Sequence, residues 1–196
     1  MKEKQTPTEF EIHPLIKNRW SPRAFANKPI AEKDIKVLLE AGRWAPSSNN
    51  LQPWRIIWGI KGTETYDRIF SCLVDFNQGW VEGAPALMMG AFKKDMKNGE
   101  KENFHALHDL GLFMGNVSVQ ATSMGIAIHQ MAGIDFKKAG KEFNFPSNYH
   151  VATGIAIGYY GGDPETLPED LQEEETKVKR ERKPQGEFAF NGNFKN

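Results

Sequence analysis

The sequence predicts one domain, spanning residues 1–196, that mixes α-helices with a small set of buried β-strands. Four short apolar runs have the length and composition of strands, and other stretches have the three- and four-residue spacing of helices. The chain has 196 residues, 39% of them hydrophobic, which suits one ordinary domain. It contains no internal repeat and no second apolar core.

The expected elements follow one another in a simple order. They are a leader (1–13), a helix that begins near Pro14 and breaks at 21–23, a helix from Pro29 to the turn-rich loop at 44–50, a strand (55–60), a polar helix (63–74), a buried strand (85–92), a charged loop (93–102), a long helix (103–125), two buried strands (126–133 and 152–160) and an extended C-terminal arm (161–196).

The helix after Pro29 rests on apolar positions at helical spacing with charges between them, namely Ile35, Leu38, Leu39 and Gly42. The loop that follows is dense in proline, serine and asparagine, which are turn-forming residues. The run at 85–92 is apolar almost throughout, as in a strand buried on both faces.

The long helix at 103–125 carries a face of small residues. These residues are spaced 4, 3, 4 and 3 positions apart, and they are Gly111, Gly115, Ser118, Thr122 and Gly125. A glycine inside a helix costs about 1 kcal/mol relative to alanine, so close helix packing is the simplest compensation. A second copy of the chain is the favoured partner, and packing within one subunit is the alternative.

The C-terminal region predicts an arm. Residues 161–183 are rich in proline and charge and have no apolar period, which favours a long extended connection. Phe188 and Phe190 alternate as in a strand. A terminal strand on a long arm suits pairing with a distant sheet edge, such as that of another subunit.

Composition excludes several classes of protein. The formal net charge is +0, from 25 basic and 25 acidic residues, so no overall field attracts nucleic acid or acidic lipid. Cys72 is the only cysteine, which rules out an intramolecular disulfide or a cysteine-based metal cluster. The sequence shows no secretory signal and no apolar run near the roughly 20 residues that span a bilayer. We therefore expect a soluble, cytoplasmic protein with no metal, nucleic-acid or membrane partner.

Three segments carry side chains suited to ligand binding. The first, Arg19-Trp20-Ser21-Pro22-Arg23, offers two guanidinium groups that can hold a phosphate or a polar ring edge, although a solvated patch is the alternative. The second, residues 45–54, is a rigid turn with neutral hydrogen-bonding groups, and its alternative is an Asx-rich helix end. The third, residues 177–184, is basic, but Glu173, Glu174 and Glu175 offset its field, so one phosphate is a better partner than nucleic acid.

Together these segments resemble the FMN-dependent nitroreductase family. The resemblance rests on five blocks in family order: RWSPRAF (19–25), AGRWAPSSNNLQPWRI (41–56), HALHDLGLFMGNVSVQATSMGI (105–126), GIAIGYY (154–160) and RERKP (180–184). It implies an α+β fold with a central, mostly antiparallel sheet of four to five strands flanked by helices. It also implies an intertwined homodimer with a swapped C-terminal strand and two FMN sites at the interface.

The resemblance also assigns cofactor contacts. Arg19, Trp20 and Ser21 correspond to the phosphate and ribityl region, and Arg23 to flavin N1 and the C2 carbonyl. The segment containing Pro46, Ser47, Ser48, Asn50 and Gln52 would come from the other subunit. A backbone N–H near flavin N5 falls within Met131, Ala132 and Gly133. Arg180 and Arg182 correspond to phosphate contacts, Asn77 to a further flavin contact, and Trp80 and Phe104 are candidate walls of the substrate pocket.

The implied activity is ping-pong hydride transfer from NADH or NADPH through flavin N5 to a small electrophile, such as a nitroaromatic or a quinone. No dedicated catalytic acid or base is expected, so His105, His108 and His129 are taken as structural. The short charged segment at 93–102 replaces the helical lid of larger members, which favours an open site. Alternatives are an enone reductase, a dehalogenase or a flavin-destroying enzyme on the same scaffold, a flavin-binding module without turnover, and an interaction protein without a cofactor.

Overall fold

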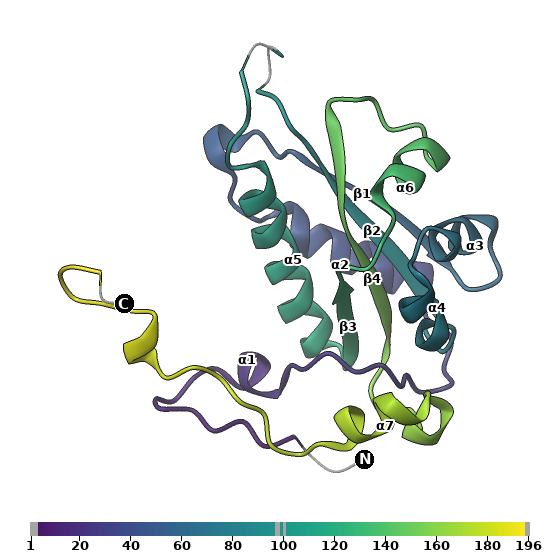
Figure 1. Cartoon of the computed structure of the whole chain (residues 1–196), viewed down its shortest axis with the longest axis vertical. Helices are drawn as coiled ribbons and strands as arrows, with labels where there is room; N and C mark the ends of the chain where they lie inside the picture. The colour runs from purple at the N-terminus through teal and green to yellow at the C-terminus, as the bar shows by residue number, and fades with distance from the viewer. Residues whose placement is uncertain (1–3, 97–98, 100, 195–196) are drawn as a thin grey trace.

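Four antiparallel strands form the centre of the molecule, a computed structural model that describes residues 4–96, 99 and 101–194 (Figure 1). The strands are β1 (Trp54–Ile60), β2 (Ala86–Lys93), β3 (Ile126–Met131) and β4 (Tyr149–Tyr159), in the spatial order β1-β2-β4-β3. Every neighbouring pair is antiparallel. The expected sheet is confirmed, with four strands.

Helices surround this sheet. They are α1 (Pro14–Asn18), α2 (Glu32–Arg43), α3 (Glu64–Ser71), α4 (Asp75–Val81), α5 (Ala106–Ser123), α6 (Phe136–Glu142) and α7 (Glu169–Thr176), with 3-10 turns η1 (Ser48–Asn50), η2 (Pro164–Thr166) and η3 (Gln185–Glu187). Figure 1 shows α5 beside the sheet and α1 near the C-terminal end of α5.

The core lies on both faces of the sheet because neighbouring residues of a strand point to opposite sides. In β2, Met88 packs in the cluster that contains the buried residues of α2 and α5. Its neighbour Leu87 packs in the cluster formed with α3, α4, α6 and α7. Both side chains have 0% exposure, which explains why β2 is apolar almost throughout.

Helix α3 lies against β1 at a glycine. A Cβ added to Gly59 would lie 2.3 Å from the backbone nitrogen of Tyr66, closer than any real contact. The Tyr66 hydroxyl donates a hydrogen bond to the Ala84 carbonyl at 3.0 Å, and its ring is buried. Glycine at position 59 therefore allows the first turn of α3 to touch the strand.

The sequence prediction misses three short helices. Helices α4 and α6 have seven residues each, too few for a clear apolar period. The extended connection expected at 161–183 is wrong in its middle part, because residues 169–176 form α7. This helix contains a single large apolar residue, Leu171, whose burial attaches it to the core.

The two ends of the chain run together. Gln5 forms a parallel bridge with Lys179, in which its N–H donates to the Val178 carbonyl at 2.9 Å and its carbonyl accepts from the N–H of Arg180 at 3.1 Å. The described part of the expected leader, residues 4–13, thus supports the C-terminal arm, while residues 1–3 lie outside the described range. Figure 1 shows both segments extending away from the sheet.

The tail lacks its expected strand in the single chain. Residues 185–187 form η3, and the described residues 188–194 pair with no strand. Phe188 and Phe194 are exposed. The arm points away from the sheet of its own chain (Figure 1), so it has no edge there to pair with, and pairing with a second subunit stays a prediction.

Among the helices of the described residues, none combines the length and apolar character that crossing a membrane requires.

Candidate functional site

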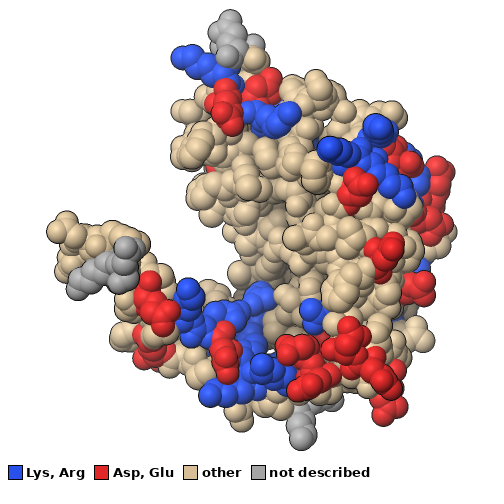
Figure 2. Space-filling model, viewed as in Figure 1, with Lys and Arg blue, Asp and Glu red and all other residues tan. Residues whose placement is uncertain are grey.

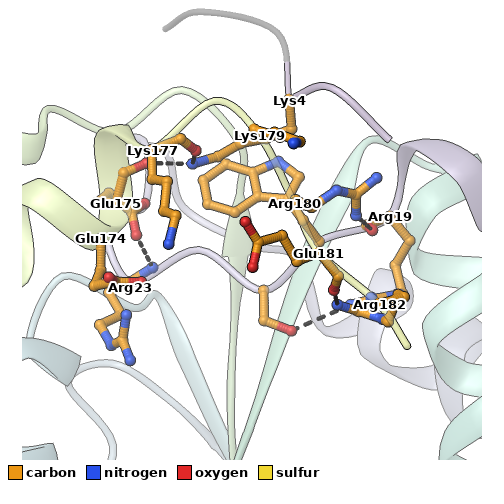
Figure 3. Close-up of a pocket in the computed structure, with 12 residues that line it drawn as sticks. Lys4, Arg19, Arg23, Glu174, Glu175, Lys177, Lys179, Arg180, Glu181 and Arg182 are labelled. Carbon is orange, nitrogen blue, oxygen red and sulfur yellow. Dashed lines mark hydrogen bonds between the residues drawn. The ribbon is translucent and has the colours of Figure 1, made fainter. Parts of the chain in front are cut away.

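A basic pocket of about 300 Å³ lies where the two ends of the chain meet the loop after α1 (Figure 3). Seven of its twelve lining residues are lysine or arginine and three are glutamate. The residues are Lys4, Arg19, Trp20, Ser21, Arg23, Glu174, Glu175, Lys177, Lys179, Arg180, Glu181 and Arg182. Figure 2 shows the basic side chains gathered where the arm leaves the body. The first and third segments singled out in the sequence therefore form one pocket.

Side chains from distant elements fix the backbone of the loop 19–24, which we call the arginine loop. Its carbonyl groups accept three hydrogen bonds: from the Arg180 guanidinium to Arg19, from the Tyr160 hydroxyl to Trp20 at 3.2 Å, and from His129 Nδ1 to Pro22 at 3.0 Å. A carbonyl can only accept, so Nδ1 of His129 carries the proton.

Glu175 completes this support from α7. Its carboxylate accepts the backbone N–H of Arg23 at 2.9 Å and that of Ala24 at 3.1 Å, and the residue is 1% exposed. In the sequence Glu175 is one of three adjacent glutamates that resemble a solvated acidic run. Only the packing of α7 against the arginine loop separates it from its neighbours.

Several arginine donors in the pocket have no partner among the described residues. Nε of Arg23 and Nε of Arg180 are buried without a hydrogen-bond acceptor. Arg19 donates to the Ser21 hydroxyl at 3.2 Å, and no described carboxylate forms an ion pair with it. Buried donors normally have partners, so these groups suit a ligand rich in acceptors.

The charges in the pocket point to an anionic ligand. Burial lowers the pKa of Arg180, and repulsion from Arg19 and Arg182 lowers it further. The terminal nitrogens of Arg180 also donate hydrogen bonds to the carbonyls of Arg19 and Lys17 and to the Thr6 hydroxyl. An anion would relieve the repulsion, and the geometry makes Arg180 mainly a support for Arg19.

A second cluster adjoins Arg23. Its guanidinium lies 6.0 Å from the centre of the Trp80 ring. Trp80 donates to the Asn77 side-chain oxygen at 3.2 Å, and the Asn77 amide donates to the Gly133 carbonyl at 2.8 Å. A Cβ on Gly133 would lie 2.4 Å from that amide nitrogen. The structure thus brings together Arg23, Asn77, Trp80 and Gly133.

The remaining predicted residues near this cluster differ in exposure. The Met131 side chain is buried in the core, whereas Ala132 is exposed. Trp20 contacts the N-terminal segment instead, where the Lys4 ammonium lies 4.3 Å from the centre of the Trp20 ring.

A different set of contacts stabilises the loop that contains Pro46, Ser47, Ser48, Asn50 and Gln52. Asn50 and Gln52 both adopt φ near the left-handed region, at 53° and 50°. The N–H of Gln52 donates to the Ser47 hydroxyl at 3.0 Å, and that of Ser48 to the buried Asp109 carboxylate at 3.1 Å. These hydrogen bonds stabilise the left-handed backbone conformation, which is unfavourable for residues other than glycine.

This loop does not reach the basic pocket within one chain. Asp109 fixes it at the N-terminal end of α5, while the arginine loop lies beyond the other end (Figure 1). Helix α5 has 18 residues, so its ends are about 27 Å apart at 1.5 Å per residue. The two halves of the expected site are therefore separated along α5.

The two suggested pocket walls also lie apart. Trp80 is 4% exposed beneath Arg23 and stacks on His129, with 4.7 Å between ring centres. Phe104 is 84% exposed just before α5 and contacts His105. The charged segment before it is closed by a bridge between Asp95 and Glu102, but residues 97, 98 and 100 lie outside the described range.

We expect His129 to make stability depend on pH. Burial lowers the pKa of His129; the bond to Pro22 raises it in part and the Arg23 charge lowers it further. As the pH falls, the unfolded chain, whose histidine pKa is about 6.5, therefore takes up a proton before the folded chain does, and stability falls as pH drops below that value.

The variant H129N keeps a side-chain donor for the Pro22 carbonyl, and its melting temperature should fall less between pH 7 and pH 5 than that of the wild type. H105N, at an exposed position without a carboxylate partner among the described residues, should fall as the wild type does; equal slopes for all three would contradict the assignment.

Comparisons with known proteins give consistent relatives. The family model described as Nitroreductase family matches residues 16–71 and 61–159. A nitrobenzene nitroreductase of Ectopseudomonas oleovorans is 38% identical over 79 residues, which cover 40% of this chain and 34% of that protein. An NADPH-dependent oxidoreductase of Staphylococcus saprophyticus is 26% identical over 182 residues, covering 81% of this chain and 65% of that protein. The chain therefore covers about a third of the length of the first relative and just under two thirds of the length of the second.

Solved structures agree over a greater length. A crystal structure of an oxidoreductase containing FMN has a TM-score of 0.91 and 31% identity, and the match covers 100% of this chain and 98% of that one. Nitroreductase A from Vibrio parahaemolyticus has a TM-score of 0.72 at 20% identity, with 93% of this chain and 76% of that chain covered, and so shows the shared fold.

Proposed function

The chain belongs to the nitroreductase family, and from this premise we propose that it binds FMN and uses NADH or NADPH to reduce small electrophiles such as nitroaromatics or quinones. The observation that carries the proposal is the basic pocket, whose arginines repel one another and whose buried N–H donors have no acceptor in the described parts of the chain. A solved structure with 31% identity over the whole chain is that of an oxidoreductase containing FMN. When bound, FMN supplies the hydride transfer itself, and the protein supplies orientation and electrostatics.

The residues of the pocket suit different parts of this cofactor. Arg19, Ser21 and Arg182 present donors for a phosphate and a ribityl chain, because guanidinium groups match phosphate geometry. Arg23 has its guanidinium beside Trp80 and an Nε with no acceptor among the residues that the structure describes, which suits the acceptor-rich pyrimidine edge of a flavin. Asn77 holds the backbone at Gly133 through a hydrogen bond, and the neighbouring exposed Ala132 would offer its N–H to the flavin.

A homodimer would complete the site. The glycine face of α5 lacks a partner among the described residues: a Cβ on Gly111 or Gly115 would meet none of their atoms within 4 Å. Leu107 and Val119 on the same helix are 59% and 40% exposed. Gly125 has a separate explanation, since its φ of 68° ends the helix. A second copy packed on this face would bring its own 46–52 loop toward the basic pocket, and Figure 2 shows the hollow beside the arm that could receive it.

The variant G115R tests this dimer. An arginine on the open glycine face should prevent close helix packing, so the mass measured by light scattering should fall from that of a dimer to that of a monomer. FMN affinity should fall with it, because half of the site would be lost. G140R places the same side chain at a helical glycine of α6 that also has open space around it, and should remain dimeric. A wild type that is monomeric with bound FMN would refute the shared site.

Steady-state kinetics test the activity. With FMN-loaded protein, NADH or NADPH as donor and p-benzoquinone or nitrobenzene as acceptor, double-reciprocal plots should give parallel lines, as expected when both substrates use the same position in turn. NAD(P)H consumption no faster than with free FMN would contradict turnover and favour a flavin-binding module.

A further inference from the structure

Glu175 occupies an unusual position for a buried acid. It lies in the last turn of α7, where the helix dipole disfavours negative charge. It is 1% exposed, and burying a carboxylate is costly unless its oxygens are hydrogen-bonded. Both side-chain oxygens of Glu175 accept hydrogen bonds from the same short segment of the arginine loop.

The contacts of Glu175 are made with backbone, not with the arginine side chain. Its Oε2 accepts from the N–H of Arg23 and its Oε1 from the N–H of Ala24. Figure 3 shows the carboxylate on the backbone nitrogen of Arg23 while the guanidinium points away from it. No ion pair joins the two residues in the described structure. Glu175 thus fixes where the Arg23 side chain begins without neutralising its charge.

In the described structure only packing holds the far end of the Arg23 side chain. Its guanidinium lies over Trp80, and its buried Nε has no acceptor among the described residues. The direction of this side chain therefore depends on how firmly its backbone is held. Hydrogen bonds to an ionised acceptor are about twice as strong as neutral ones, which suits a carboxylate for this role.

We propose that Glu175 is a positioning residue that holds Arg23 toward the flavin, and that it favours reduced FMN over oxidised FMN through the Arg23 charge. The inference rests on the proposed FMN site. A guanidinium near the flavin pyrimidine stabilises the negative charge that the ring carries after reduction. Glu175 contributes to this effect indirectly, by fixing the backbone from which the guanidinium extends.

The sign of the effect separates this role from a direct one. If Glu175 acted through its own negative charge, E175Q would favour reduced FMN and raise the midpoint potential. If it positions Arg23, E175Q disturbs the loop and lowers the potential. We expect E175Q to weaken the binding of reduced FMN relative to oxidised FMN about tenfold, which is about 30 mV for a two-electron couple.

A double-mutant cycle tests the proposal. The midpoint potential of bound FMN is measured by spectroelectrochemistry for wild type, E175Q, R23Q and the double variant. R23Q should lower the potential at least as much as E175Q, and the double variant should match R23Q alone, because Glu175 acts through Arg23. Additive shifts, an unchanged E175Q, or a raised potential would overturn the proposal.

Two further variants keep the test decisive. Y66F removes a buried hydrogen bond to Ala84 away from the pocket and should leave the potential unchanged, which separates positioning from general loss of stability. E175D keeps the charge but withdraws it by one methylene group, and it carries the same test if E175Q does not yield folded protein. A wild type that binds no FMN would instead reject the proposed function.

Discussion

Replacing Arg19 with alanine should weaken FMN binding about 100-fold and leave riboflavin binding unchanged. Arg19 lines the basic pocket with its guanidinium available to a phosphate, and its carbonyl, which Arg180 holds, survives the change. Two charge-assisted hydrogen bonds at about 1.5–3 kcal/mol each account for a loss of roughly 3 kcal/mol, which is about 100-fold in Kd. Titration of the apoprotein with each flavin, followed by fluorescence, measures both constants.

The comparison of two flavins makes this prediction specific. Riboflavin lacks the phosphate, so a pocket that merely loses its shape would lose both ligands equally. R43A is the matched control, since Arg43 is exposed on α2 and pairs with Glu40 at 2.6 Å. It should bind FMN as the wild type does. Equal losses of FMN and riboflavin in R19A would show that Arg19 does not contact a phosphate.

The substitution G59A should destabilise the fold strongly. A Cβ at this position would lie 2.3 Å from the Tyr66 nitrogen and 2.8 Å from the Thr65 carbonyl carbon, so the first turn of α3 must move. Tyr66 is buried and hydrogen-bonded to Ala84, which resists that movement. Overpacking of this kind costs about 1–3 kcal/mol, which lowers the melting temperature of a domain of this size by about 2–12 °C.

Calorimetry of G59A and G140A at the same flavin saturation measures the difference. Gly140 lies in α6 with open space where a Cβ would be, so G140A should be neutral or more stable by up to about 1 kcal/mol. If G59A melts with the wild type, then α3 and β1 do not pack as closely as described.

The sequence predicts strand β2 and helix α2 well because their patterns are strong. The run at 85–92 is apolar on both faces, and β2 is buried on both faces. The helix after Pro29 repeats its apolar positions at helical spacing, and Ile35 and Leu38 are fully buried in the structure. Such patterns arise locally, so they can be recognised without knowledge of the rest of the fold.

Other features depend on contacts between distant residues and leave little local signal. Helix α7 is acidic with one large apolar residue, so it resembles a solvated linker until Leu171 and Glu175 are seen to be buried. The pairing of Gln5 with Lys179 joins the two ends of the chain and follows no local pattern.

For the site, the family resemblance assigns Arg19, Arg23 and Arg182 to one cofactor, and in the structure these residues line a single pocket. It assigns Asn77 and Gly133 separately to the flavin, and the structure shows a hydrogen bond between them. In the single chain, the loop around Ser47 lies at the opposite end of α5 from the basic pocket. Phe104 is exposed, whereas Trp80 is buried. A single subunit cannot unite these groups, which is why the dimer is part of the proposal.

The most direct test of the account is the visible absorption spectrum of the protein incubated with FMN, freed of excess cofactor, and then treated with NADH or NADPH without oxygen. We expect flavin bands that remain with the protein through gel filtration and bleach when the donor is added. A protein that stays colourless after incubation with FMN would contradict the central claim.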